Sequence, residues 1–586
     1  MDPALASVAL PREDAVVGIR TVRLTGLAIG IGIAGGFVAK ALLLLIGLIT
    51  NLAFYGRFDT SFVSPSGNEL GLVAMLVPIL GALLVGLMAR FGSSAIRGHG
   101  IPEVMEKVLH GESRIPIRLM FLKPLSAAIA IGTGGPFGAE GPIIATGGAL
   151  GSTIGQVIRI SAEERKTLLA AGAAAGMSAT FGAPVSAVLL AVELLLFEYR
   201  ARSIIPVALA SAAAAAVRIG IEGPEPVFTL PPIGHPTGAA LATYALLGAI
   251  MGVVAAAVTR SIYALEDAFE RLPLHWMWWP ALGAVVVGAV GLVEPRTLGV
   301  GYDLIDQILA GELTGVSLAL FVVLKFVSWS AYLGSGTSGG TLAPLFLIGG
   351  GIGAGLGGFV AAWLPALDVN PSIAGLVGMA AIFAGASHAL LASVVFAFET
   401  TRQPLGLLPL LAGCSAAYLV MLLLNRTSIM TERLARRGTY VRTEYALDYL
   451  SQISVQSVMT RSVVTLSASD TLGRVRAWLD AGADGATHQG FPVVDAAGKL
   501  LGVVTRRNLR APGDDGASIA SLLQRPPVVI FPDSTLREAA DQMVRAQVGR
   551  LAVVARNDHR RLLGIVSRSD LLAAHATRLR QMEEDG

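Results

Sequence analysis

The sequence predicts an all-α polytopic membrane domain of two repeats with re-entrant, broken helices, followed by a soluble α/β domain. Three observations predict this fold class. First, 53% of the 586 residues are hydrophobic and 15% charged, and charge is scarce through Leu24–Leu424 but dense from Arg426 onward. Second, a glycine-rich stretch recurs in the apolar part. Third, a strand-rich unit recurs in the charged part. We therefore expect a membrane domain over 24–440, a linker over 441–454 and a soluble domain over 455–586.

The first 23 residues form a polar leader that carries Arg12, Arg20 and Arg23. No cleavage-site pattern closes a short hydrophobic region there, so we predict no signal peptide. Positive charge ahead of the first span places the N-terminus in the cytoplasm. The first apolar run, Leu24–Phe54, is interrupted by Lys40, whereas Leu70–Met88 is a cleaner span.

Further apolar stretches follow as far as Leu424, and several are shorter than the ~20 residues that a full span needs. Re-entrant and tilted helices explain such lengths better than a plain bundle. The stretches fall near 120–160, 167–197, 203–217, 238–260, 278–293, 316–333, 342–364, 373–398 and 407–424.

Net charge and cysteine content set two further limits. The formal charge of +3 is small for this length and gives no indication of nucleic acid as a partner. The single Cys414 lies in an apolar run, which excludes a disulfide within one chain and favours a packing role.

The glycine-rich stretch Gly132–Pro142 carries five glycines, two prolines and one carboxylate, Glu140. Glycine-rich backbone at membrane depth leaves amides unpaired, which lipid tolerates only where they line a polar cavity or an ion path. An ionisable side chain in such a place indicates function. Glu140 is therefore the first candidate site residue.

The same stretch returns at Gly334–Pro344, which predicts two homologous halves over about 24–200 and 235–430. A shift of 202 positions overlays Gly138 on Gly340, and a shift of 206 overlays Glu193 on Glu399. Broken elements in two such halves predict a transport site where the repeats meet. Helix N-termini aimed at that site favour anions. Leu342 stands where the first half has Glu140, so we expect a pore with one carboxylate.

A basic segment follows the second span and contains the turn Gly98–Pro102, which leads into a helix-like stretch. Its positive charge favours the cytoplasmic side. His99 beside a helix start is able to donate to an anion, and it equally fits an exposed loop residue. Spacing alone leaves both interpretations open.

The soluble part contains two units, 455–512 and 520–575. Each has the pattern of a strand, a helix, a hairpin of two strands and a closing helix. A polar cleft between such units is able to hold a nucleotide, with Asp570 placed to bind ribose hydroxyls. The alternative is that Asp570 and Asn508 only cap their helices.

These motifs resemble the CLC family of chloride channels and anion/proton antiporters, and the soluble part resembles a tandem CBS pair. The resemblance covers about Leu24 to Ala574. The family's order is kept by Gly98–Pro102, Gly138–Pro142, Gly339–Pro344 and the helix ends at Glu193 and Glu399.

The resemblance implies a membrane domain built from inverted repeats. It also implies a homodimer in the cell (plasma) membrane, with one pore per subunit and the CBS pair in the cytoplasm. It implies a transport protein rather than an enzyme, with chloride or a related anion as substrate and lipid around it. Neither a metal nor a required cofactor is implied. An adenine nucleotide at the CBS pair is the expected regulator, and the residues expected to bind it are Thr465, Asn508, Ser567 and Asp570. Because Asn508 replaces the ribose-type carboxylate, we expect at most one strong nucleotide site.

Glu140 matches the family's gating glutamate, whose carboxylate competes with the permeating anion and swings out on protonation. His99 and Met430 fall where the family usually has a serine and a tyrosine at the central anion site. Ala139 replaces the usual basic residue before the gating glutamate. The resemblance assigns anion binding or selectivity to His99, Gly100, Ile101, Gly138, Ala139, Gly141, Thr341, Leu342 and Met430.

Two departures from the family bear on mechanism. Met430 cannot donate a hydrogen bond, whereas His99 can, so we expect conduction or selectivity to depend on pH through His99. Leu194 stands where the antiporters have a proton-transfer glutamate, and an apolar side chain cannot relay a proton. Glu193 or Glu198 would have to substitute in any proton path that also uses Glu140.

The resulting expectation is a passive, Glu140-gated chloride channel regulated by its CBS pair. The alternative is an antiporter of chloride or another anion with protons, using a non-standard proton path. A CBS-regulated cation transporter is a third reading. It would need a ring of acidic or carbonyl ligands in the membrane, where this sequence has few acids.

Overall fold

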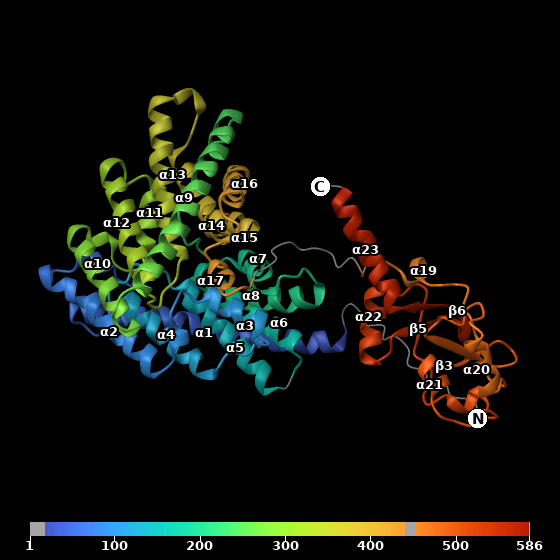
Figure 1. The fold of residues 1–586 in the computed structure, drawn as a ribbon. Coiled ribbons are helices and arrows are strands. Elements are labelled where there is room, and N and C mark those ends of the chain that lie inside the picture. Colours follow the sequence, from blue (N-terminus) through green and yellow to red (C-terminus); the bar gives the residue numbers. More distant parts are fainter. Residues whose placement is uncertain (1–17, 159, 232, 440–449, 451–452, 585–586) are drawn as a thin grey trace. The chain divides into compact units, whose positions relative to one another are not determined.

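The computed structural model describes residues 18–158, 160–231, 233–439, 450 and 453–584, and it divides into two compact units. We call them the membrane unit, within 16–443, and the tail unit, within 444–586. Most of the expected leader (1–17) and most of the expected linker (440–449 and 451–452) lie outside the described residues. The membrane unit is helical, and the tail unit contains both strands and helices (Figure 1).

The membrane unit is helical, and its helices fall into two series of the same order. Eight of the described helical segments are long and apolar enough to cross a membrane. The first series is α1 (Ile19–Tyr55), α2 (Leu76–Phe91), α3 (Ile101–His110), α4 (Ile117–Gly132), α5 (Glu140–Val157), α6 (Ala162–Phe181), α7 (Pro184–Ala191) and α8 (Ala201–Glu222).

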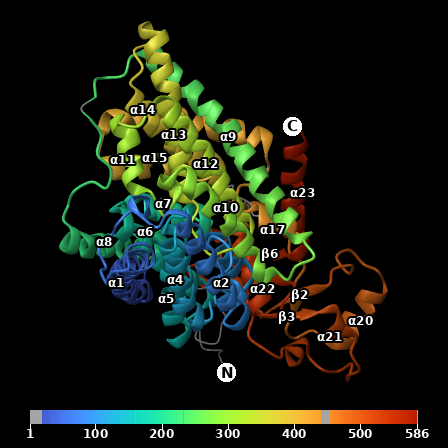
Figure 2. The same cartoon turned by 90° about the vertical axis from the view of Figure 1, so that its left-hand side faces the viewer.

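The second series repeats this pattern of long and short helices. It consists of α9 (Gly238–Glu270), α10 (Trp279–Val293), α11 (Tyr302–Ala310), α12 (Gly315–Gly334), α13 (Leu342–Trp363), α14 (Pro371–Ser387), α15 (Leu390–Thr401) and α16 (Leu407–Leu424), and the short α17 (Glu432–Arg436) follows it. The first series (blue to teal) packs along the second (green to gold) in both views (Figures 1 and 2).

Matching contacts relate the two series. Helix α1 packs on α6 and α8 as α9 packs on α14 and α16, and α5 packs on α6 as α13 packs on α14. The starts of α5 and α13 meet in an antiparallel bridge, where the N–H of Gly340 donates to the carbonyl of Gly138 at 3.0 Å. Matching helices that meet start to start agree with the inverted repeats that the resemblance implies.

Glycines also recur within the helices of the two repeats, where the backbones of neighbouring helices approach each other closely. A Cβ atom at Gly147 on α5 would meet the carbonyl oxygen of Gly172 on α6. The same holds for Gly349 on α13 and Gly378 on α14. Small residues allow such backbones to touch in lipid, where packing rather than the hydrophobic effect holds helices together.

Helix α1 continues through Lys40, the charged residue that interrupts the first apolar run. The Lys40 ammonium pairs with Glu222, at the end of α8, at 2.8 Å. Because the charge has a counter-ion, the helix does not have to break there.

The tail unit contains the two repeated units that the sequence predicts. The first has β1 (Leu466–Ser467), α20 (Leu472–Asp480), β2 (Gly490–Val494), β3 (Leu500–Thr505) and α21 (Arg506–Arg510). The second has β4 (Val529–Ile530), α22 (Leu536–Arg545), β5 (Arg550–Ala555), β6 (Asp558–Ser567) and α23 (Arg568–Glu584). In each sheet the first strand pairs in parallel with the second, which pairs antiparallel with the third. Leu450 and Ile453, from the expected linker, pack on the core of the second unit, as does the short α19 (Val455–Val458).

Candidate functional site

The glycine turns that precede α3, α5 and α13 lie against one another. The N–H of Gly98 donates to the carbonyl of Thr337 at 2.9 Å, and the Gly138–Gly340 bridge joins the other two turns. A Cβ atom at Gly141 would stand 3.3 Å from the Cα of Gly340 and would collide with the carbonyl oxygen of His99. Three helix starts, each with unpaired N–H groups and a partial positive charge, thus meet around one place, which suits an anion.

The carboxylate of Glu140 occupies this meeting point. Glu140 is fully buried, and its Oε1 accepts a hydrogen bond of 2.7 Å from the hydroxyl of Tyr302. The other oxygen, Oε2, has no hydrogen-bond partner within the described residues. It lies against Gly138 and 3.0 Å from the position that a Cβ atom at Gly340 would take. The side chain is therefore folded back over its own helix start, between the two glycine turns.

Tyr302 is a site residue that the sequence analysis missed. It is the first residue of α11 and follows Gly301, whose φ of 80° is in the left-handed region. The signal was present, because a shift of 201 positions overlays Gly98-His99-Gly100-Ile101 on Gly299-Val300-Gly301-Tyr302. The starts of α3 and α11 are thus equivalent elements of the two repeats.

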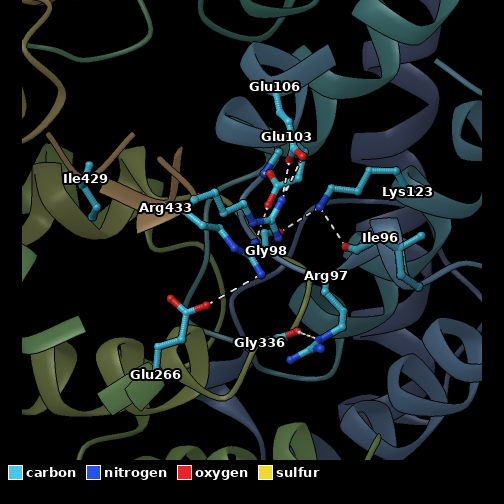
Figure 3. A network of polar contacts seen from close by, with 12 residues as sticks. Ile96, Arg97, Gly98, Glu103, Glu106, Lys123, Glu266, Gly336, Ile429 and Arg433 are labelled. Carbon is cyan, nitrogen blue, oxygen red and sulfur yellow. Dashed lines mark hydrogen bonds and ion pairs between the residues drawn. The ribbon is translucent and has the colours of Figure 1, made fainter. Parts of the chain in front are cut away.

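Two buried lysines hold these equivalent turns. Lys123 on α4 donates to the carbonyls of Ile96 and Gly98, both at 2.8 Å (Figure 3). Lys325 on α12, 202 positions later, donates to the carbonyls of Thr297 and Gly299, both at 2.9 Å. Each ammonium satisfies carbonyls that helical bonding leaves free, and thereby fixes the turn before a short helix.

His99 is a buried residue, so the exposed-loop interpretation is wrong. It is 9% exposed, and its Nδ1 has no hydrogen-bond partner among the residues that the structure describes. Gly100 and Ile101 follow it into α3, and both are buried. Glu103, Lys123 and Arg433 are the charged groups that surround the imidazole. The expected dependence of transport on pH through His99 stays a prediction.

Met430 is fully buried in the turn Ser428–Thr431, which precedes α17. The N–H of Ile429 donates to the carbonyl of Ala386 at 2.8 Å, and the hydroxyl of Tyr263 donates to the carbonyl of Ile429 at 2.8 Å. Within the turn, the Ser428 hydroxyl accepts the N–H of Met430 at 3.2 Å. The turn is therefore held by backbone, hydroxyl and tyrosine bonds, and the Met430 side chain adds no donor to it. Thr341 and Leu342, at the start of α13, are buried as well.

Ion pairs tie the start of α3 to α9 and α17 (Figure 3). Glu103 accepts the N–H of Gly100 at 2.7 Å and pairs with Arg433 at 3.0 Å. Arg433 also lies 3.6 Å from Glu266 on α9. Arg97 donates to the carbonyl of Gly336 at 3.2 Å. These contacts fix the turns before α3 and α13 relative to the segment that carries Met430.

Glu193 and Glu399 each cap a helix of the other repeat. The Glu193 carboxylate accepts the N–H groups of Leu391 and Ala392, at the start of α15, at 3.0 and 3.1 Å. Glu399 accepts those of Val185 and Ser186, at the start of α7, at 3.0 and 2.8 Å. We call these reciprocal contacts the carboxylate caps.

The expected proton path therefore has few free groups. Glu193 lies in a π-helical turn, Val192–Leu196, with both carboxylate oxygens occupied by its cap. Leu194 is buried. Glu198 accepts a hydrogen bond from Ser203 at 2.7 Å and lies 3.5 Å from Arg200, at the start of α8.

The tail unit contains a cavity of about 300 Å³. Two of the four expected nucleotide ligands, Ser567 and Asp570, line it, whereas Thr465 and Asn508 are not among its lining residues. Asn508 accepts the N–H of Thr505 at 3.0 Å, and Asp570 accepts that of Ser567 at 2.7 Å. Both side chains therefore act as helix caps, and one oxygen of Asp570 remains for a ligand.

Arg550, which the sequence analysis missed, also lines this cavity. It is the first residue of β5, and its guanidinium makes no hydrogen bond or ion pair with another described side chain. Burial lowers the pKa of Arg550 from its usual value, as expected for a charge without a counter-ion. A phosphate group is the kind of ligand that would balance it.

Family models identify both units. The model described as "Voltage gated chloride channel" matches residues 80–422, and the CBS domain model matches 455–511 and 519–576.

Three curated relatives illustrate the range of similar proteins. "Putative chloride channel protein ClcB-like" of Ralstonia nicotianae is 28% identical over 63% of this chain and 90% of its own length. "H(+)/Cl(-) exchange transporter ClcA" of Vibrio cholerae is 31% identical over 62% of this chain and 79% of its length. "Chloride channel protein CLC-f" of Arabidopsis thaliana is 27% identical over 84% of this chain and 72% of its length.

Two solved structures share the fold. A slow cyanobacterial Cl⁻/H⁺ antiporter has a TM-score of 0.64 and 23% identity, covering 72% of this chain and 98% of that chain. A eukaryotic CLC transporter has a TM-score of 0.60 and 22% identity, covering 94% of this chain and 98% of that chain. At these identities the likeness speaks for the fold alone.

Proposed function

The chain belongs to the CLC family, the voltage gated chloride channels, and from this premise we propose that it exchanges chloride for protons with Glu140 as the gate. Membership makes it an anion transporter of the membrane with a CBS pair. The finer statement, that anion transport is coupled to protons and gated by Glu140, is the proposal.

The position of the Glu140 carboxylate is the observation that carries it. A buried carboxylate at a junction of helix starts stands where a permeating anion would be stabilised. Protonation removes the charge of the carboxylate and with it the attraction to the helix starts. A chloride ion is then able to take its place. One group thus binds a proton or yields to an anion, which is the requirement for exchange.

The names of several relatives support exchange over passive conduction. The sequence analysis put a passive channel first, because Leu194 interrupts the usual proton path. Several relatives are named H(+)/Cl(-) exchange transporters, and this favours the antiporter alternative. The inner proton step then falls to His99, because Glu193 and Glu198 are engaged elsewhere. The buried Nδ1 of His99 has no hydrogen-bond partner in the part of the chain that the structure describes.

Passive conduction is the second candidate. It is favoured by the buried, apolar Leu194 and by the cap that occupies both oxygens of Glu193. A chain in which His99 relays no proton would conduct chloride without coupling.

Simultaneous recording of chloride efflux and internal pH in proteoliposomes tests the proposal. Under exchange, a chloride gradient drives protons against their own gradient at a fixed ratio to chloride. His99→Ser then loses the proton flux while chloride still moves. Chloride efflux from the wild-type protein without opposing proton movement would establish the passive reading instead.

The remaining proposals concern assembly and regulation. A homodimer is proposed in line with the resemblance to the CLC family. We place the protein in the cell membrane with its N-terminus and tail in the cytoplasm, in line with the basic leader. The cavity of the tail unit is proposed to bind an adenine nucleotide.

A thermal-shift assay on the tail unit (444–586) tests the nucleotide site. AMP at a hundred times its dissociation constant should stabilise the fold by about 2.7 kcal/mol, which is a rise of several degrees in Tm. Adenosine should stabilise less, because it offers no phosphate to Arg550. Arg550→Gln should remove the difference between the two ligands. Arg474→Gln, which removes an exposed charge outside the cavity, is the control. Equal shifts with both ligands would exclude Arg550 as the phosphate ligand, and no shift with any adenine nucleotide would exclude the site.

A further inference from the structure

We propose that Tyr302 is the latch of the gate: its hydroxyl holds the Glu140 carboxylate in the anion pathway and donates to the anion when the carboxylate leaves. This inference rests on the proposed role of Glu140. It assigns a positioning and ligand role to a residue of the second repeat, at the start of α11.

The hydrogen bonds around Glu140 define the latch. Tyr302 donates to Oε1 at 2.7 Å, whereas Oε2 has no partner among the described atoms. A phenol hydroxyl offers one donor, and a charged acceptor strengthens the bond it makes. The tyrosine therefore supplies the one side-chain hydrogen bond that the structure records on this carboxylate. This bond favours the position of the carboxylate between the two glycine turns.

The tyrosine ring is held firmly, which makes it able to act as a latch. It packs edge-on against Phe181 with ring centroids 5.8 Å apart, and it stacks on Phe62 at 6.5 Å. Phe181 in turn packs against Phe396 at 4.9 Å. Phe62, Phe181 and Phe396 come from distant parts of the chain, so a small backbone shift at α11 alone does not reorient the ring.

The turn before Tyr302 is equally fixed. Lys325 donates to the carbonyls of Thr297 and Gly299, and its Nζ lies 3.7 Å from the position of a Cβ atom at Gly301. The start of α11 therefore stays in place when Glu140 moves. What changes is only the partner of the Tyr302 hydroxyl.

The hydroxyl gains from an acceptor in both states of the gate. It is partly buried, so leaving it without a partner costs part of its desolvation. Once Glu140 is protonated and swings away, a chloride ion in its place restores the lost bond. The same donor thus serves the carboxylate and the anion in turn, and it sets how readily one replaces the other.

Turnover and chloride affinity in proteoliposomes, with four variants, test the latch. Tyr302→Phe keeps the ring and removes the hydroxyl. We expect its maximal chloride flux to rise about tenfold, because one hydrogen bond to a charged group no longer holds the carboxylate. We expect the chloride concentration for half-maximal flux to rise several-fold. Tyr332→Phe is the matched control, since Tyr332 is fully buried and its hydroxyl has no partner among the described residues; it should change neither quantity.

The Glu140→Gln background separates the latch from a general structural effect. There Tyr302→Phe should no longer raise the flux, since no carboxylate is held, but should still weaken chloride binding measured by calorimetry in detergent. An equal rise in both backgrounds, or a wild-type flux and affinity in Tyr302→Phe, would overturn the latch. If Glu140→Gln itself leaves proton coupling intact, the gate proposal fails instead, and the two failures are therefore distinguishable. Size-exclusion profiles identify any variant that misfolds. If Tyr302→Phe misfolds, chloride binding is measured by calorimetry on Tyr302→Trp instead, because tryptophan keeps an aromatic ring without the hydroxyl.

Discussion

Glu140→Gln is expected to abolish proton movement while chloride continues to flow. Glutamine has nearly the shape of the protonated acid, so it has no charge to hold at the junction of helix starts and no proton to release. Loss of a group that both accepts and donates the transported proton lowers such a step by at least about a hundredfold. Proton flux should therefore fall to the background of empty vesicles.

The dependence of chloride flux on pH is expected to differ between the wild-type protein and Glu140→Gln. In the wild-type protein, chloride exchange should increase as the outer pH falls, because protonation releases the carboxylate. In Glu140→Gln the chloride flux should be flat over the same range. Glu399→Gln is the control, since it changes a carboxylate of the same unit that caps α7. A Glu140→Gln protein that still carries protons at the wild-type ratio would contradict the gate.

Gly138→Ala is expected to expel the carboxylate without removing it. A Cβ atom at Gly138 would overlap the Glu140 carboxyl group, which is the end of a flexible side chain. The backbone of Gly138 lies outside the left-handed region, so alanine is tolerated there. The side chain, rather than the helix, then has to move. Chloride flux should rise about tenfold or more and lose most of its dependence on pH, because the pathway is open in either protonation state.

Gly340→Ala is the control for Gly138→Ala, because it adds the same methyl group where the neighbour is backbone rather than a flexible side chain. Its Cβ atom would collide with the carbonyl oxygen of Gly138, which is backbone and belongs to the bridge between α5 and α13. That variant should lose folded protein and flux together in size-exclusion and efflux measurements. A Gly138→Ala protein with the flux and pH profile of the wild type would show that the carboxylate does not block the path.

The place of the proposed gate, Glu140, was predictable from local sequence. Gly138 and Glu140 sit in a pattern that lipid tolerates only at an ion path, and its return at Gly340 indicates two repeats. The tail was predictable for a similar reason, since hydrophobic alternation and turn residues determine each strand and helix. Such features depend on neighbours in the chain.

The partners of the gate were not predictable in this way. Tyr302 is 162 residues from Glu140, and nothing in its own segment marks it except a short glycine pattern. Lys123 and Lys325 read as ordinary positive charges, yet the fold buries both to hold turns. Arg550 opens a strand, and only the arrangement of the two CBS modules reveals the cavity beside it.

The carboxylate caps also bear on how the protein is made. The N–H of Ser186 donates to the carboxylate of Glu399, which lies 213 residues further along the chain. Until Glu399 has been synthesised, the N–H groups of Val185 and Ser186 at the start of α7 lack the acceptor that they have in the folded protein. Glu193 is made earlier, but it caps no helix until α15 follows it. The two carboxylate caps are therefore able to form only after most of the second repeat has been synthesised.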